Sequence, residues 1–227
     1  MSELTDPQLR VAVTLATIPG DEGVHRDISE LGMRGAHDKW LAGDGPKVFC
    51  QNWKRAIHQA PEVLANGLRR GFRFVTPADD EWSESFAALD DLAPLGLWLR
   101  GHGNLRELSK RAISIVGARS STSYGERIAS ELASFAAGNR VTVVSGAAYG
   151  IDAAAHRGAL ANNGATIAVL ACGVDIAYPA SHNTLLARIA ETGLIVSEHA
   201  PGQTPRKPGF LIRNRLIAAL GSSTVVV

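Results

Sequence analysis

The 227-residue sequence contains little cysteine: Cys50 and Cys172 are the only two. They lie far apart and neither belongs to a Cys-x-x-Cys pair, which excludes a disulfide framework and a zinc site built from paired thiolates. We expect both side chains to be buried free thiols, which pack as small apolar groups.

Long hydrophobic runs are also absent. The longest apolar stretches have the length of a strand and are interrupted by glycine or polar residues, whereas a membrane-spanning helix needs roughly 20 consecutive apolar residues. Residues 1–6 lack the basic-then-apolar pattern of a signal peptide. These absences predict a cytoplasmic protein with no membrane partner.

The usual nucleotide and metal signatures are missing as well. No G-x-x-x-x-G-K-[ST] motif occurs, which excludes a P-loop. A dinucleotide site needs G-x-G-x-x-G, but Gly117 is followed by no second glycine until Gly125. No His-x-x-x-His pair or carboxylate cluster suggests a metal centre. We therefore expect no cofactor, no metal and no catalytic residues.

The main positive feature is a short apolar strand, a glycine-rich turn and a helix, repeated four times between Ile113 and Val227. This repetition predicts an α/β fold, a Rossmann-like doubly wound parallel sheet. The expected strands are 113–116, 141–144, 166–170, 194–196 and 225–227. The expected helices are 124–137, 152–162, 183–192 and 213–220.

The chain divides into three parts by composition. Residues 1–70 read as a small helical N-terminal domain, with helices expected over 9–16 and 48–68. Residues 71–110 read as a connecting segment that packs on the main domain and contains two extended pieces. Residues 111–227 form the expected sheet domain.

Charge is distributed unevenly between the two halves. Residues 1–110 carry 13 basic and 16 acidic residues, a net charge of −3, whereas residues 111–227 carry 10 and 6, a net charge of +4. The basic residues gather between His199 and Arg215, a stretch with no carboxylate that contains Arg206, Lys207, Arg213 and the aromatic Phe210. Such a segment favours an anionic ligand.

Polar residues follow the first two expected strands of the sheet domain, where ligands bind in this fold. Arg119 can meet a phosphate in a bidentate way, and Ser145 and the Gly146 N–H can bind its oxygens. Asp152 is placed to cap the next helix and to pair with His156 one turn later. Phe210 could stack on a base or pack in the core, and the residues alone leave both open.

Six segments together resemble the DNA-processing protein A family, also called DprA or Smf. They are IVGAR (115–119), VSGAAYGIDAAAH (144–156), AVLACGVD (168–175), YP (178–179), SE (197–198) and FLIRNR (210–215). A weaker similarity extends upstream through residues 74–98, and the helical part resembles the family's variable, SAM-like first domain.

The resemblance implies a non-enzymatic, homodimeric protein that binds single-stranded DNA entering the cell during natural transformation, protects it and loads a RecA-type recombinase. It also implies a DNA site with seven residues of the matching motifs, to which we add Arg206 and Lys207 from the basic segment. Those seven are Gly117, Arg119, Ser145, Gly146, Phe210, Arg213 and Asn214.

The chain departs from the family pattern in two places. Tyr149 stands where many relatives have a basic residue, which predicts that one phosphate contact is lost or replaced by stacking. The chain ends at Val227, before the point where the family usually continues. We therefore expect the sheet domain to be incomplete at its C-terminus, leaving residues 225–227 as an uncovered strand.

A second hypothesis is a Rossmann-like nucleotide or nucleoside phosphohydrolase, because similar folds bind nucleoside monophosphates at the same edge. That class resembles P-G-G-x-G-T-x-x-E, a motif that this sequence lacks. Glu198 is the only carboxylate that could serve as its catalytic base.

Overall fold

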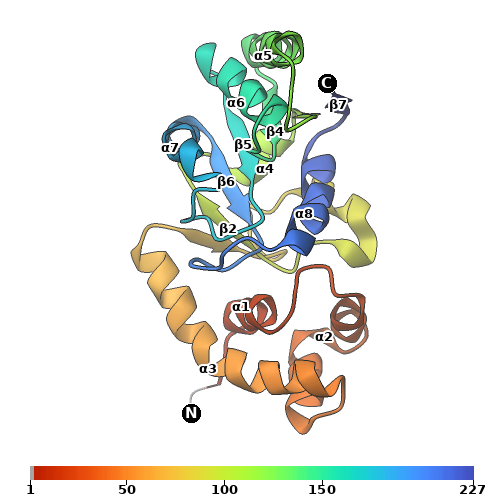
Figure 1. The fold of residues 1–227 in the computed structure, drawn as a ribbon. Coiled ribbons are helices and arrows are strands. Elements are labelled where there is room, and N and C mark those ends of the chain that lie inside the picture. Colours follow the sequence, from red (N-terminus) through yellow and green to blue (C-terminus); the bar gives the residue numbers. More distant parts are fainter. Residues whose placement is uncertain (1–2) are drawn as a thin grey trace.

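The computed structural model describes residues 3–227 and places three N-terminal helices beneath a seven-stranded sheet (Figure 1). The helices are α1 (Asp6–Ala16), α2 (Glu22–Ala42) and α3 (Lys47–Arg69). The sequence predicted parts of α1 and α3 but missed α2, whose glycines and charged residues weaken its apolar pattern. Gly32 interrupts α2 with a φ of 69°.

The helical module (residues 3–70) has an aromatic centre. The Trp40 and Trp53 rings meet edge to face with centroids 4.8 Å apart, and Phe49 packs against Trp40 at 5.0 Å. The Trp40 indole N–H donates to the Asp27 carboxylate at 2.6 Å, so this buried polar group is satisfied. Helices α2 and α3 thus supply the aromatic rings, and apolar residues of α1 complete the same core.

Seven strands form one sheet in the order β1-β2-β6-β5-β4-β3-β7. Their bounds are β1 (Arg73–Val75), β2 (Leu97–Arg100), β3 (Ala112–Val116), β4 (Thr142–Ser145), β5 (Thr166–Val169), β6 (Leu194–Ser197) and β7 (Thr224–Val226). Strands β6, β5, β4, β3 and β7 are mutually parallel, which confirms the predicted sheet. Strands β1 and β2 extend it antiparallel, so segment 71–110 forms part of the sheet itself.

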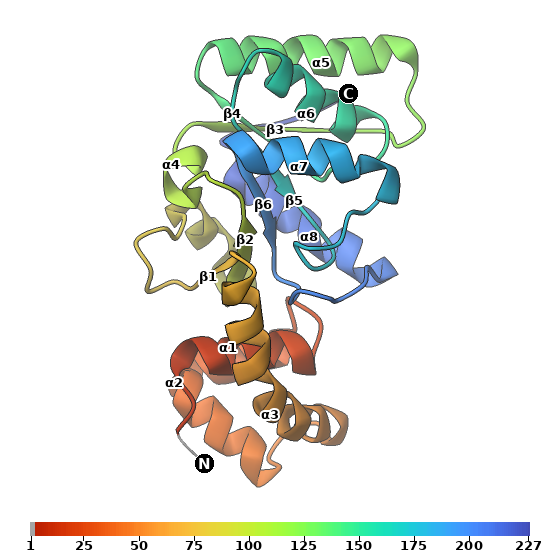
Figure 2. The same cartoon turned by 90° about the vertical axis from the view of Figure 1, so that its left-hand side faces the viewer.

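Helices cover both faces of the sheet (Figures 1 and 2). The helices on one face are α5 (Ser123–Gly138), α6 (Ile151–Ala161) and α7 (Asn183–Thr192), and the other face is covered by α8 (Lys207–Leu220) and the 3-10 helix η1 (Glu84–Leu92). Along β6, Ile195 packs with α7 whereas Leu194 and Val196 pack with α8. This alternation buries both faces, as a doubly wound sheet requires.

Helix α8 begins at Lys207, six residues before the predicted start. Pro208 stands in the first turn of α8, where proline is tolerated because no intrahelical partner exists there for its missing N–H. The longer helix places Phe210 and Arg213 three residues apart on one helix face.

The helical module and the sheet share one core. The cluster that contains Trp53 continues through Trp98 of β2 to Ile195 of β6. Gly67 allows this contact, because a Cβ at that position would overlap the Trp98 indole ring. The Arg10 side chain adds a hydrogen bond of 2.8 Å to the Leu95 carbonyl.

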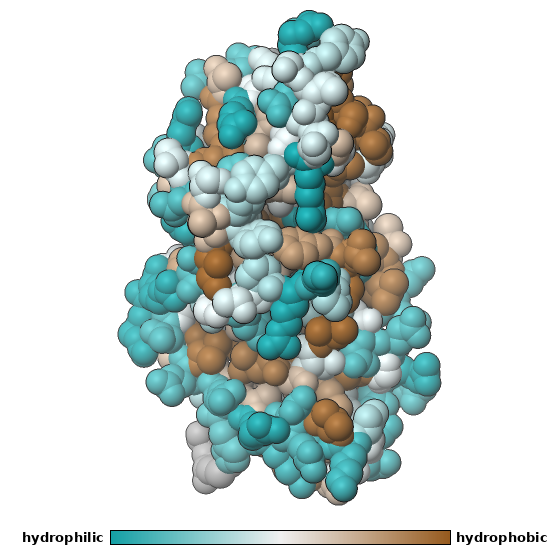
Figure 3. Space-filling model, in the orientation of Figure 1, coloured by the Kyte–Doolittle hydropathy of each residue, from teal (hydrophilic) through white to brown (hydrophobic). Residues whose placement is uncertain are grey.

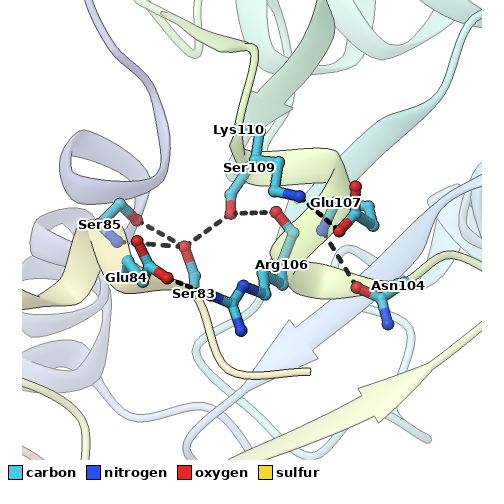
Figure 4. A network of polar contacts seen from close by, with 8 residues as sticks. All are labelled: Ser83, Glu84, Ser85, Asn104, Arg106, Glu107, Ser109 and Lys110. Atoms are coloured by element: carbon cyan, nitrogen blue, oxygen red, sulfur yellow. Dashed lines mark hydrogen bonds and ion pairs between the residues drawn. The ribbon is translucent and has the colours of Figure 1, made fainter. Parts of the chain in front are cut away.

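A polar network joins η1 to the short helix α4 (Leu105–Ser109) (Figure 4). The Ser83 hydroxyl lies 2.6 Å from that of Ser109, and Arg106 pairs with Glu84. Asn104 begins α4 by accepting the Glu107 N–H at 3.0 Å. The segment before β3 therefore contains a short helix packed onto η1.

Both cysteines are buried and free, as predicted. Burial raises the pKa of the Cys172 thiol to about 11, which keeps it protonated at neutral pH. Hydrophobic and hydrophilic residues are interspersed over the face drawn in Figure 3. Within residues 3–227, every helix is too short or too polar to cross a membrane.

Replacing Gly67 with alanine should destabilise the protein by about 1 kcal/mol net. Overpacking a tight contact costs about 1–3 kcal/mol, more than the gain of up to about 1 kcal/mol in helix propensity. Gly23→Ala is the control, because a Cβ there meets only Asp21 Oδ1 at 3.4 Å. Urea unfolding of both variants tests the contact, and an unchanged midpoint for Gly67→Ala would refute it.

Candidate functional site

A small pocket of about 60 Å³ lies where the carboxyl ends of β3, β4 and β5 meet the first turns of α8. This volume equals roughly two water molecules at about 30 Å³ each, far below the roughly 300–1,000 Å³ of an enclosed small-molecule site. The lining residues are Arg119, Gly146, Ala148, Tyr149, Leu170, Ala171, Cys172, Tyr178, Pro179, Phe210 and Arg213.

One wall of the pocket is an exposed cation over an aromatic ring. The Arg119 guanidinium carbon lies 5.2 Å from the Phe210 ring centroid, and the Tyr178 and Phe210 ring centroids are 5.3 Å apart. Arg119 has no carboxylate partner among residues 3–227. Tyr178 is 45% exposed and Phe210 is half-buried, so both rings lie at the rim.

Arg213 forms the base of the pocket. Its side chain is buried, Nη1 donates to the Gly146 carbonyl at 2.8 Å, and Nη1 also contacts the Val169 carbonyl. Burial lowers the pKa of Arg213 to about 10, so the group stays charged at neutral pH. Gly146 is required here because a Cβ would overlap the guanidinium. Nη2 has no acceptor among residues 3–227 and remains available to a ligand.

Ser145 and Gly117 lie at the strand ends but do not line the pocket. The Ser145 hydroxyl is buried and donates to the Ile115 carbonyl at 2.7 Å, which ties β4 to β3. A Cβ at Gly117 would overlap the backbone oxygen of Val227 and press against Ile151, so this glycine allows the close approach of the segment after β7 and of α6. Both residues therefore shape the edge and present no free polar side chain to it.

The remaining predicted residues lie around the start of α8. Arg206 and Lys207 are exposed just outside the pocket, with no ion pair among residues 3–227. Asn214 is exposed, and its Oδ1 accepts a hydrogen bond from Arg213 Nε at 3.2 Å.

The predictions for Asp152 were wrong in two respects. Gly150, with a φ of 74°, precedes α6, and Asp152 is the second residue of the helix. Its carboxylate accepts the Ala148 N–H at 3.3 Å, and burial raises its pKa. His156 does not pair with it, because the His156 ring is turned toward Thr166 of β5.

His156 is a fully buried neutral side chain. Its Nδ1 lies 2.7 Å from the Thr166 hydroxyl, which itself donates to the Val143 carbonyl at 2.6 Å, so Nδ1 carries the proton. Burial, with the nearby charges of His182 and Arg213, lowers the pKa of His156 to about 3. Its Nε2 has no hydrogen-bond partner among the described residues.

Glu198 is held by an arginine. Both of its carboxylate oxygens accept from Arg215, at 2.6 and 2.7 Å, and Arg215 Nε donates to the Leu92 carbonyl. Only 6% of Glu198 is exposed. A carboxylate with both oxygens paired in the interior is unsuited to act as a general base.

Tyr149, where the sequence predicted that a phosphate contact is lost or replaced by stacking, lines the pocket and is 51% exposed, with its hydroxyl 3.0 Å from Ser181 Oγ. One feature could not be predicted from the sequence. A second, larger cavity of about 710 Å³ lies between the helical module and the loop before α8. Its walls come from segments far apart in sequence, so no local pattern could predict it.

His156 should make the protein acid-sensitive. The unfolded chain binds a proton on histidine near pH 6.5, but the folded protein does so only near pH 3. Stability is therefore lost as pH falls through this window, by up to about 1.4 kcal/mol per pH unit for one proton. Replacing His156 with glutamine should flatten this dependence in urea unfolding between pH 7 and 4.

The exposed residue His58 provides the control, because His58→Gln removes a histidine without touching the interior. Equal pH slopes for wild type and His156→Gln would contradict the assignment. A lower stability of His156→Gln at pH 7 would not, because the comparison concerns the slope.

Sequence comparison matches residues 73–227 to the family of DNA recombination-mediator protein A. A DNA processing protein DprA of Mycobacterium tuberculosis is 47% identical over 184 residues, which cover 77% of this chain and 47% of that protein. The Bacillus subtilis DprA is 33% identical over 74% of this chain and 56% of its own length. The chain thus spans about half the length of the curated relatives it matches.

Two relatives of solved structure share the fold. The X-ray structure of DprA from Streptococcus pneumoniae superposes with a TM-score of 0.78 at 26% identity, over 99% of this chain and 78% of that one. DNA processing protein A from Helicobacter pylori, described with a single-stranded DNA binding mode, gives a TM-score of 0.60 at 32% identity, over 68% of this chain and 69% of that one.

Proposed function

Because the chain belongs to the DNA recombination-mediator protein A family, also named DprA or Smf, we propose that it binds single-stranded DNA at the small pocket. The observation that carries this proposal is the Arg119–Phe210 pair, an unpaired exposed cation above an aromatic ring. Single-strand binders combine these two elements, because the cation meets the phosphate and the ring stacks on a base.

The size of the pocket supports a polymer over a small molecule. At about 60 Å³ it can receive a phosphate group or the edge of a base, but it cannot enclose a nucleotide. An extended strand requires no enclosure, since it gains affinity from successive shallow contacts. The DNA-binding mode described for the Helicobacter pylori relative supports the same ligand here.

Each residue of the site has a distinct proposed role. Arg119, Arg206 and Lys207 neutralise phosphates, and Phe210 stacks on a base with Tyr178 beside it. Asn214 contributes a hydrogen bond. The roles of the remaining residues follow from their burial: Arg213 and Gly146 form the base of the pocket, and Ser145 and Gly117 hold the strand ends that carry it.

The wider role follows from the family. A recombination mediator hands single-stranded DNA to a recombinase, so we propose that a homodimer of this protein works in the cytoplasm. It would protect incoming strands during natural transformation and load a RecA-type recombinase. The family description supports this role.

The phosphohydrolase alternative finds little support. Its only candidate base, Glu198, is engaged by Arg215 through both oxygens. We therefore propose that the protein binds DNA and does not cleave it.

The protein should bind a single-stranded oligonucleotide at least tenfold more tightly than blunt duplex DNA, because stacking requires exposed bases. Affinity should fall as salt rises, and Arg119→Gln should reduce the slope of log K against log salt by about 0.7. Arg127→Gln is the control, because Arg127 also lies over a ring, that of Tyr124, but is paired with Glu131. Equal affinity for single strand and duplex would overturn the proposal.

Phe210→Ala should weaken DNA binding by about 1–3 kcal/mol, the contribution of one stacked base, and leave stability nearly unchanged. Phe135→Ala provides the control, because Phe135 is 73% exposed on α5 and does not line the pocket. Calorimetric binding and thermal melting separate the two roles. A loss of about 3–5 kcal/mol in stability would instead identify Phe210 as a core residue.

A further inference from the structure

The cavity of about 710 Å³ is a groove with three walls. The end of α1 and the turn after it form one wall (residues 14–18), α3 forms the second (residues 52–59), and the loop between β6 and α8 forms the third (residues 199–206). Figures 1 and 2 show this loop running along the junction between the helical module and the sheet. The Gln203 side chain joins two walls by donating to the Thr14 carbonyl at 3.2 Å.

The groove is lined by cations and amides without any carboxylate. Arg55 and Arg206 supply the charge, and His199 and Gln59 supply further polar groups. Among residues 3–227 the only hydrogen bond of the Arg55 side chain is to Asn52 Oδ1 at 3.2 Å, and the Arg206 side chain has none. Both guanidinium groups therefore remain available to an anion.

The groove adjoins the Phe210 pocket across the first turn of α8. Arg206 lines the groove and Phe210 lines the pocket, and four helical residues rise by only about 6 Å. Gly209 allows the first turn of α8 to pack closely against His199, because a Cβ at this position would lie only 3.2 Å from His199 Nε2. Lys207 and the positive end of the α8 helix dipole lie between the groove and the Phe210 pocket.

We propose that this groove binds the phosphodiester backbone of the DNA strand beyond the Phe210 pocket, with Arg55 and Arg206 contacting its phosphates. The helical module then forms one wall of the DNA site. This inference rests on the proposed function and adds a second contact region to it. The absence of lining carboxylates favours a polyanion, and the mainly polar lining argues against a docked hydrophobic peptide.

The test compares Arg55→Gln with Lys54→Gln in the full chain. Both residues are exposed and adjacent on α3, but Lys54 does not line the groove. Oligo-dT of about 4 and about 16 nucleotides, the range of site sizes for single-strand binding folds, serves as the probe. Arg55→Gln should weaken binding of the longer strand about tenfold, as expected for one charge-assisted contact. It should leave the affinity for the short strand and the melting temperature unchanged.

A second variant, Gln59→Glu, places a carboxylate in the groove without removing a cation, and it should also weaken only the longer strand. The inference is overturned if Arg55→Gln and Lys54→Gln bind the longer strand equally. It is also overturned if Arg55→Gln leaves DNA binding intact and instead weakens binding of a Glu-rich peptide. Failure of the proposed function is distinguishable, because wild type would then bind neither length.

Discussion

The buried guanidinium of Arg213 is the interaction on which the functional edge depends. Arg213 extends from α8 to the carbonyl groups of Gly146 and Val169. Gly146 directly follows β4, and Val169 is the last residue of β5. A charged group in the interior is costly unless its hydrogen bonds are made, so α8 and both strand ends must sit in register for the protein to fold. Phe210 lies one turn earlier on the same helix. The hydrogen bonds that Arg213 needs fix the position of α8, and they thereby place the Phe210 ring at the pocket.

This arrangement separates support from contact within a short stretch of chain. Buried polar groups such as Arg213, Ser145 and His156 bond to carbonyls or to other buried side chains and hold the strand ends together. The exposed side chains Arg119 and Tyr178 do not hold the strand ends together, and they lie at the rim of the pocket. A rigid base with unpaired cations above it suits a flexible, charged polymer, because the polymer supplies the conformational adjustment.

The helical module is joined to the sheet by a continuous core, and this junction fixes the position of the groove walls. Trp98 packs against α3 at Gly67, so α3 cannot move without disturbing the sheet. The loop before α8 then runs beside the module, held by the hydrogen bond from Gln203 to Thr14. Arg55, from the acidic half of the sequence, and Arg206, from the basic half, thereby line one groove. The net charges of the two halves of the sequence therefore do not show that cations from both halves line the same groove.

Local patterning was enough to predict the strands and helices of residues 111–227, apart from the first six residues of α8, because apolar runs bounded by glycine turns report burial directly. It also brought Arg119 and Gly146 to one edge, since parallel strands end on the same side, whereas Phe210 and Arg213 were assigned to the site by the basic segment and the family resemblance. It missed α2, whose apolar residues are interrupted by glycines and charged residues, and it misjudged Asp152. The burial of polar side chains such as Arg213 and Glu198, their hydrogen-bond partners and the groove were decided only by the tertiary structure. Which donor meets which acceptor depends on distances between elements, and no spacing along the chain contains those distances.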